Sequence, residues 1–177
     1  MKYIIVARHG LSVGSEDNKV LDDKGREQMR RLAETIKRVA PFKLANIFSS
    51  AALWVAQSAK ILADEFLTQN LVFPALSNGD SQQVIELVSS FQALDAEAIV
   101  LVTHEKLTSL FSNALFTHLF NRKLKFFSAW PGEAYLLNLE KDAALFISAC
   151  WLDKPPYTQE VGSGYWLNSA PKTRIEI

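Results

Sequence analysis

The sequence has few thiol and imidazole groups: its 177 residues include one cysteine and three histidines. The single thiol, Cys150, excludes an internal disulfide and any zinc or iron–sulfur site built from several cysteines. Net charge is also missing, because 19 Lys and Arg residues balance 19 Asp and Glu residues. A neutral chain has no overall positive field to hold a phosphate backbone, so we predict no nucleic-acid partner.

Long hydrophobic runs are absent as well. Lys2 is followed by five apolar residues before Arg8 interrupts the run. A secretory signal needs a longer apolar stretch, and a membrane helix needs about 20 apolar residues. We therefore predict a cytoplasmic protein with no membrane partner. Hydrophobic residues make up 49% and charged residues 21%, which is typical of a globular chain, and the length suits a single domain over residues 1–177.

Strand and helix patterns alternate as far as about residue 122. The runs that predict strands are 3–7, 44–48, 71–73 and 98–102. Apolar residues at helical spacing follow each of them, with Asp22 or Asp23 and Ser50 as predicted N-caps of the first two helices. The four alternations predict an α/β fold, a three-layer sandwich with a mostly parallel sheet and helices on both faces.

The pattern changes after residue 122. Residues 125–129, 134–139 and 144–151 resemble strands joined by turns, and they predict antiparallel edge strands near the C-terminus. Cys150 is expected to be buried and inert within the last of these strands. The tail at 153–177 holds three of the six prolines, so we expect it to be irregular.

Two of the three histidines fall at strand ends, where open α/β sheets bind ligands. His9 follows the first strand and His104 follows strand 98–102. His118 lies within the next helix, beside its apolar stripe, and we interpret it as a packing residue. A neutral imidazole held in one tautomer is a nucleophile at neutral pH, which makes His9 and His104 the first residues to consider for chemistry.

The neighbours of His9 suit an anion. Arg8 presents a fork of donors that matches phosphate or carboxylate, and Gly10 allows a sharp turn and a close approach of a ligand to the main chain. Ser12, two residues further on, is a plausible phosphate donor. The segment therefore favours an anion site at the end of the first strand.

Several segments together are similar to the histidine phosphatase superfamily, which is also called phosphoglycerate-mutase-like. The segments are Arg8-His9-Gly10, Leu21 to Gln28, Ser49-Ser50, Gln57-Ser58-Ala59 and Val102-Thr103-His104. The resemblance runs from about residue 2 to residue 140. The short length, and Leu76 to Asp80 before a predicted helix, resemble the small phosphohistidine-phosphatase branch.

The resemblance implies a role for each matching residue. His9 attacks phosphorus and becomes a phosphohistidine, while His104 stabilises the equatorial oxygens. Arg8 clamps the phosphoryl group, and the backbone at Gly10 and Glu105 adds N–H donors. No metal and no cofactor are expected, because cationic side chains supply the charge stabilisation. The implied partner is a phosphorylated substrate, either a phosphoprotein or a small phosphoester, and no feature predicts the oligomeric state.

One position departs from the family pattern. After Ser49-Ser50 the family has a second phosphate-clamping arginine, and this chain has Trp54 there. An indole has one donor and no charge, so the loss amounts to roughly 3–4 kcal/mol of transition-state stabilisation. A nearby cation can substitute, or a substrate can stack on the ring, or the chain can be a relative that binds phosphate without efficient turnover. The cations considered from sequence position are Arg26, Lys60 and Lys106.

The acid that protonates the leaving group is the remaining question. Asp80 is the first choice, because it lies at a predicted helix start near the strand ends, although an N-cap role explains it equally well. Glu105 is the second choice, and Glu16 or Asp17 is the third. The sequence thus predicts a phosphatase acting through His9, with a phosphate-binding or regulatory protein as the alternative.

Overall fold

The computed structural model describes residues 1–15, 18–43, 45–92, 96–161 and 175–176. The strands of this part are β1 (Tyr3–Arg8), β2 (Ser12–Val13), β3 (Val20–Leu21), β4 (Ala45–Ser49), β5 (Asn70–Val72), β6 (Ala98–Thr103), β7 (Glu133–Asn138), β8 (Ala143–Ser148), β9 (Tyr157–Val161) and β10 (Ile175–Glu176). The helices are α1 (Asp23–Val39), α2 (Leu53–Glu65), α3 (Ala75–Asn78), α4 (Ser81–Gln92) and α5 (Glu105–Phe120).

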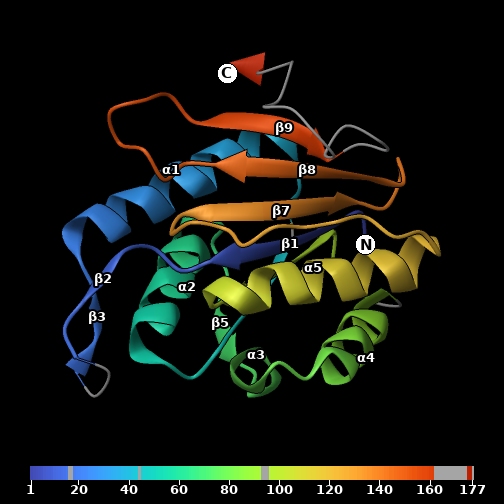
Figure 1. The fold of residues 1–177 in the computed structure, drawn as a ribbon, viewed down its shortest axis with the longest axis horizontal. Helices are drawn as coiled ribbons and strands as arrows, with labels where there is room; N and C mark the ends of the chain where they lie inside the picture. The colour runs from blue at the N-terminus through green and yellow to red at the C-terminus, as the bar shows by residue number, and fades with distance from the viewer. Residues whose placement is uncertain (16–17, 44, 93–95, 162–174, 177) are drawn as a thin grey trace.

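The described strands form an eight-stranded sheet in the order β10-β9-β8-β7-β1-β6-β4-β5, and β2 and β3 form a separate hairpin. Strands β1, β6, β4 and β5 run parallel, whereas β7, β8, β9 and β10 are antiparallel to their neighbours. The parallel strands β1 and β6 are buried on both faces, as their unbroken apolar runs predict. The hairpin extends beyond the end of β1 (Figure 1).

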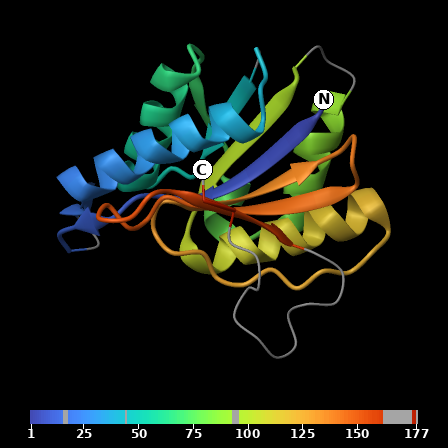
Figure 2. The same ribbon diagram turned by 90° about the horizontal axis from the view of Figure 1, so that it is seen from above.

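Helices cover the sheet on both faces (Figure 2). Helices α1 and α2 pack on one face through a core that includes Ile5, Leu32 and Leu62. Helices α3, α4 and α5 pack on the other through a core that includes Val6, Val88 and Phe111. The predicted α/β class, with a parallel sheet between two helix layers and antiparallel strands near the C-terminus, is confirmed.

The connections of the sheet separate at the ends of β1 and β6. The chain leaves β1 towards α1 on one face, and it leaves β6 towards α5 on the opposite face. Neighbouring parallel strands whose connections diverge leave an opening at their carboxyl ends. The register pairs Arg8 with Thr103, so the residues that follow, His9 and His104, enter this opening side by side.

The first helix begins as predicted. The side chain of Asp22 accepts a hydrogen bond of 2.6 Å from the Gly25 N–H and caps α1. The second helix does not begin at Ser50: its N-cap is Ala52, whose side chain makes no capping bond. The prediction for Ser50 was wrong because its hydroxyl contacts a histidine instead.

Residues 125–129 are not a strand, contrary to the prediction. Their backbone groups bond to side chains rather than to a neighbouring strand. The Asn113 side chain bonds both the N–H and the carbonyl of Phe126, and the Tyr135 hydroxyl bonds both groups of Phe127. Phe126 and Ala129 are buried, which explains why the segment has an apolar, strand-like sequence.

The C-terminal region also differs in detail from the sequence analysis. Strand β8 ends at Ser148, so half-buried Cys150 follows the strand instead of lying in it. Burial raises the pKa of its thiol to about 11, which agrees with an inert thiol. Residues 157–161 form β9, where we expected irregular chain, because Tyr157 to Val161 pair with β8. Residues 162–174 and 177 of the tail lie outside the described residues.

His118 is exposed in the last turn of α5 and does not pack in the core, contrary to our interpretation. The buried side of α5 instead carries Phe111, Leu115 and Phe116. Within the described residues, none of the helices combines the length and the apolar character that crossing a membrane requires.

A close backbone contact fixes the chain that leaves β1 against the start of α1. A Cβ atom on Gly25 would lie 2.1 Å from the Leu11 carbonyl oxygen, and a Cβ on Gly10 would lie 2.4 Å from the Gly25 carbonyl oxygen. Real carbon and oxygen atoms do not approach so closely without displacing the backbone. This contact therefore requires glycine at both positions.

We expect Gly25→Ala to lower the free energy of unfolding by about 3 kcal/mol, because the added methyl group must push α1 away from the His9 segment. Lys24→Ala, an exposed neighbour in the same helix turn, is the matched control and should stay within about 0.5 kcal/mol of the wild type. Urea unfolding measures both. A Gly25→Ala variant as stable as the control would contradict the contact.

Candidate active site

His9 is a buried histidine with one assigned tautomer. The residue is 6% exposed. Its backbone N–H donates to the Thr103 carbonyl, and its own carbonyl accepts from the Gly132 N–H. The ring Nδ1 lies 2.7 Å from the Gly10 carbonyl oxygen. A carbonyl only accepts, so Nδ1 carries the hydrogen and Nε2 keeps its lone pair. This is the tautomer that a nucleophilic Nε2 requires.

His104 lies beside His9. It is the N-cap residue of α5, and its carbonyl accepts the N–H of Thr108. The two imidazole centroids are 5.8 Å apart with an interplanar angle of 74°. The Ser50 hydroxyl is 3.0 Å from His104 Nε2 and fixes that ring. The structure thus brings together the two histidines that the sequence placed at strand ends.

Trp54 completes a triangle of rings with these histidines. Its ring centroid is 6.2 Å from that of His9 and 5.9 Å from that of His104, with edge-type geometry to both. The indole Nε1 is buried and has no hydrogen-bond partner among the described residues. Trp54 therefore lies against both histidines.

Lys19 supplies a cation at this place, and the sequence analysis missed it. Its Nζ atom lies 5.0 Å from the centroid of the Trp54 ring, within cation–π distance. Lys19 precedes β3, and the Gln57 side chain holds that strand to α2 by accepting the Leu21 N–H at 2.8 Å. No spacing in the sequence signals this contact, because the hairpin must first dock on α2.

The electrostatic environment keeps both histidines neutral at pH 7. Burial is the largest cause that lowers the pKa of His9, and the charges of Arg8 and Lys19, with that of His104 once it is protonated, lower it further, to about 4. The bond to the Gly10 carbonyl opposes this shift. The pKa of His104 is lowered by burial, then by Lys19 and Arg8. A neutral His9 is ready to attack without first losing a proton.

Arg8 is tied to protein groups on the α5 side of the sheet. Its Nη1 donates to the Ala129 carbonyl at 2.7 Å, and its Nη2 pairs with the half-exposed Glu105 carboxylate at 3.1 Å. Burial lowers the pKa of the guanidinium, while Glu105 and Glu133 raise it. The Nε atom is buried without a partner among the described residues. Both terminal nitrogens of the guanidinium, which we expected to bind phosphate, thus contact groups of the protein itself.

Gly10 does not offer its N–H to a ligand as we expected. The N–H donates at 3.2 Å to the Ser58 hydroxyl, which in turn donates to the Trp54 carbonyl. The absence of a side chain at Gly10 admits the backbone of Gly25 rather than a substrate. Ser12 lies in β2 and is partly exposed on the hairpin.

The predicted acids lie in different places. Asp80 caps α4: its Oδ1 accepts the Gln83 N–H at 3.0 Å and its Oδ2 accepts the Gln83 side-chain amide at 2.7 Å. None of the described hydrogen bonds or ion pairs joins Asp80 to either imidazole, and the bonds to Gln83 match the N-cap role that the sequence left open. Glu105, by contrast, directly follows His104 and pairs with Arg8. Glu16 and Asp17 lie outside the described residues.

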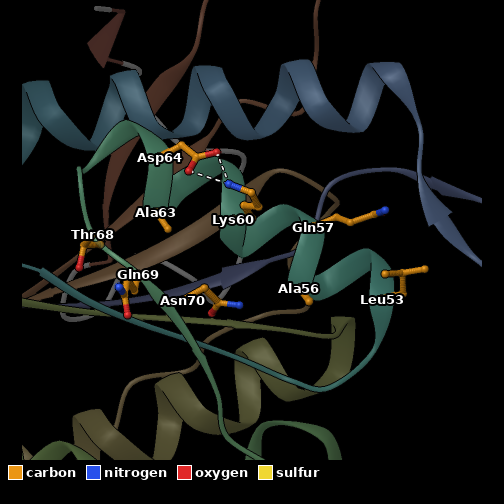
Figure 3. Close-up of a pocket in the computed structure, with 9 residues that line it drawn as sticks. All are labelled: Leu53, Ala56, Gln57, Lys60, Ala63, Asp64, Thr68, Gln69 and Asn70. Carbon is orange, nitrogen blue, oxygen red and sulfur yellow. Dashed lines mark hydrogen bonds and ion pairs between the residues drawn. The ribbon is translucent and has the colours of Figure 1, made fainter.

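The cations proposed from sequence position are not the ones at the histidines. Neither Arg26, Lys60 nor Lys106 is among the charges that shift the pKa values of the two histidines. Lys60 instead pairs at 2.8 Å with Asp64 on the outer side of α2, where both side chains are exposed. That side borders an open hollow of about 580 Å³ beside β5 (Figure 3). No histidine lines this hollow, so it is separate from the ring triangle.

No cluster of three or more His, Cys, Asp or Glu side chains that is arranged to hold a metal ion occurs in the described part of the chain. The residues that do converge are two neutral imidazoles, one indole and the Lys19 ammonium. Helix α5 begins next to them, and the first N–H groups of a helix have no partner within it. Uncharged imidazole nitrogens, a cation and a helix N-terminus suit a tetrahedral oxyanion.

Comparison with solved structures finds the same fold in phosphatases. The protein histidine phosphatase SixA, solved with tungstate, aligns with a TM-score of 0.64 at 18% identity over 84% of this chain and 97% of that one. A mycobacterial glucosyl-3-phosphoglycerate phosphatase, Rv2419c, gives 0.58 at 16% identity over 78% and 90%. YhfR of Bacillus stearothermophilus gives 0.53 at 16% identity over 76% and 89%.

No model of a known protein family matches the chain, and no curated protein matches it. The likeness to solved structures therefore concerns the fold. At that level the predicted resemblance to the histidine phosphatase superfamily is confirmed.

The lowered pKa of His9 predicts a pH-dependent stability. Above the ordinary value of 6.5 both folded and unfolded chains hold His9 neutral; between 6.5 and about 4 only the unfolded chain takes up the proton. The free energy of unfolding therefore falls as the pH drops through this range, and His9 contributes about 3 kcal/mol of that fall.

We expect the His9→Asn variant to lose the contribution of His9 to this pH dependence. The His118→Asn variant, which changes an exposed histidine, should keep it. Urea unfolding from pH 7 to pH 4 gives both slopes, and equal slopes would contradict the assignment.

Proposed function

We propose that this protein is a phosphatase that transfers a phosphoryl group to His9 and then to water. The observation that carries the proposal is the neutral His9 imidazole, whose Nε2 lone pair is directed by the Nδ1–H bond to Gly10, set 5.8 Å from the His104 ring. A second support is the Lys19 ammonium over Trp54, next to both rings. A neutral nucleophile and a nearby cation both favour the transfer of a phosphoryl group to histidine.

In the proposed first step, a bond forms from His9 Nε2 to phosphorus while the bond from phosphorus to the leaving group breaks. The leaving group takes a proton from a carboxyl group, with Asp80 or Glu105 as the proposed acid. In the second step a water molecule gives up a proton to the same carboxylate and attacks phosphorus. Inorganic phosphate leaves, and His9 regains its lone pair.

Charge on the phosphoryl oxygens is stabilised by the groups around the rings. Lys19 takes the place of the arginine that Trp54 replaces, His104 donates to an equatorial oxygen, and the start of α5 contributes backbone N–H groups. Arg8 adds a positive charge through space, since Glu105 and Ala129 hold its guanidinium. The site thus depends on few cations, in keeping with the balanced charge of the chain.

The proposed substrate is a protein phosphohistidine or a small phosphoester. The fold neighbours support this range: SixA is named a protein histidine phosphatase and was solved with tungstate, and Rv2419c acts on a glucosyl-3-phosphoglycerate. A cytoplasmic location, the single domain over 1–177 and the lack of a cofactor stay predictions from the sequence.

A second function, phosphate binding or regulation without efficient turnover, is favoured by two observations. Trp54 places an indole where a bidentate cation is expected, and both ends of the Arg8 guanidinium already contact protein groups. A site of this kind retains an anion by charge but stabilises the transition state less. Turnover and phosphate affinity therefore have to be measured separately.

The role of His9 predicts complete loss of turnover in one variant. His9→Asn should lower hydrolysis of an aryl phosphate by roughly 10⁴-fold or more, because an amide is no nucleophile. His118→Asn, on the exposed side of α5, is the matched control and should keep wild-type activity. Acid-labile labelling of the wild type, absent from His9→Asn, would identify the intermediate. A wild type that binds inorganic phosphate without turnover would select the binding function, and an active His9→Asn would refute the site.

The role of Lys19 predicts a second, graded effect. Lys19→Met keeps the apolar stem over Trp54 but removes the charge, so we expect kcat to fall roughly 10²-fold. Trp54→Arg in the Lys19→Met background should restore most of that loss, because it returns a cation to the same side of the rings. The Lys60→Met variant, which removes a lysine on the outer side of α2, is the control and should keep the kcat of the wild type. Unchanged kcat in Lys19→Met would show that the cation has no part in turnover.

A further inference from the structure

A second hollow, of about 300 Å³, lies on the antiparallel half of the sheet, bordered by strands β7, β8 and β9 and the segment that precedes β7. Six aromatic residues line it: Phe127, Trp130, Tyr135, Phe146, Trp151 and Tyr157. The three remaining lining residues, Ser128, Glu133 and Gln159, are polar. Such a concentration of rings around one hollow is typical of a binding site rather than of general surface.

Two of these rings are unusually exposed. Trp130 is 61% and Trp151 is 49% exposed, and their centroids lie 6.0 Å apart with an interplanar angle of 38°. Burying an indole against its neighbours would be favourable, yet these two stand at the rim of the hollow. The inner rings form a connected wall, since Phe146 contacts both Tyr135 and Tyr157.

Two of the six lining rings lie within cation–π distance of lysines of the chain itself. Lys125 Nζ lies 5.3 Å from the centroid of Phe127, and Lys154 Nζ lies 5.6 Å from that of Trp151. Aromatic faces carry negative electrostatic potential, and several rings around one space add their effects. The hollow therefore favours a positively charged occupant over a neutral one.

Glu133 strengthens that preference and narrows the class of cation. The residue is only 4% exposed. Its Oε2 accepts the backbone N–H of Trp130 at 2.6 Å, and its Oε1 accepts from the Ser148 hydroxyl and the Cys150 thiol. Three of about four acceptor positions are thus used. The carboxylate supplies negative charge but has little capacity left for an N–H donor, which disfavours a guanidinium or a primary ammonium group.

We propose that this aromatic pocket binds a quaternary ammonium group. Such a cation gains from the ring faces and from the Glu133 charge, and it has no N–H hydrogen that needs an acceptor. The pocket adjoins the His9 segment, because Arg8 donates to the Ala129 carbonyl and Gly132 donates to the His9 carbonyl. The pocket has its own lining, however, so the proposal does not depend on turnover at His9.

Binding of choline chloride, followed through its N-methyl signal by ligand-observed NMR, tests the proposal on the full chain. We expect saturable binding in the millimolar range or tighter. The neutral isostere 3,3-dimethylbutan-1-ol has the same shape without the charge and should bind about tenfold more weakly. Guanidinium chloride at the same low concentration should not compete with choline.

Variants locate the site. Trp130→Leu and Trp151→Leu should each weaken choline binding about fivefold, and Glu133→Gln, which keeps an acceptor for Trp130, should weaken it as well. Leu152→Ala, a partly exposed neighbour outside the lining, is the matched control. Equal binding of the neutral isostere, absence of choline binding, or unchanged affinity in both tryptophan variants would overturn the proposal. None of these binding experiments measures turnover at His9. A failure of the proposed phosphatase function would therefore be seen separately from a failure of choline binding.

Discussion

The parallel register between β1 and β6 is the constraint on which the site depends. Pairing of Arg8 with Thr103 brings the next residue of each strand, His9 and His104, to the same level of the sheet. One chain then turns towards α1 and the other begins α5, so two imidazoles meet in the opening between them. A shift of the register by one residue would turn one of the two rings to the wrong face. Both strands lie inside the sheet, where β7 pairs with the other edge of β1 and β4 with the other edge of β6.

The charge at the site comes from a different part of the structure. The β2–β3 hairpin reaches the start of α2 through the Gln57 side chain, and Lys19 thereby comes to lie over Trp54. The lysine from the hairpin lies over the face of an indole that contacts both histidines, so one positive charge lies near both imidazoles. Burial and the charges of Arg8 and Lys19 lower the pKa of His9 and keep its Nε2 unprotonated. In the proposed reaction, the Lys19 charge would therefore act on both the nucleophile and the phosphoryl oxygens.

The sequence analysis succeeded where local patterns decide. The cap at Asp22, the buried strands and the strand-end positions of His9 and His104 follow from residue type and spacing. It was wrong where a tertiary partner takes over a group. Ser50 bonds His104 instead of capping α2, Gly10 gives its N–H to Ser58, and residues 125–129 satisfy their backbone through Asn113 and Tyr135. In each case a side chain from another element bonds the hydroxyl or backbone group to which the local sequence pattern had given a different role.

The sequence by itself determined the fold class and the two strand-end histidines, because periodicity and order along the chain encode them. Only the tertiary structure decided which cation stands near the rings, since Lys19 and Trp54 are 35 positions apart and meet through docking of the hairpin. It also decided that Asp80 caps a helix and that six aromatic side chains surround one hollow. The physical reason is the same throughout: contacts between distant segments depend on how surfaces pack, and no local pattern records that.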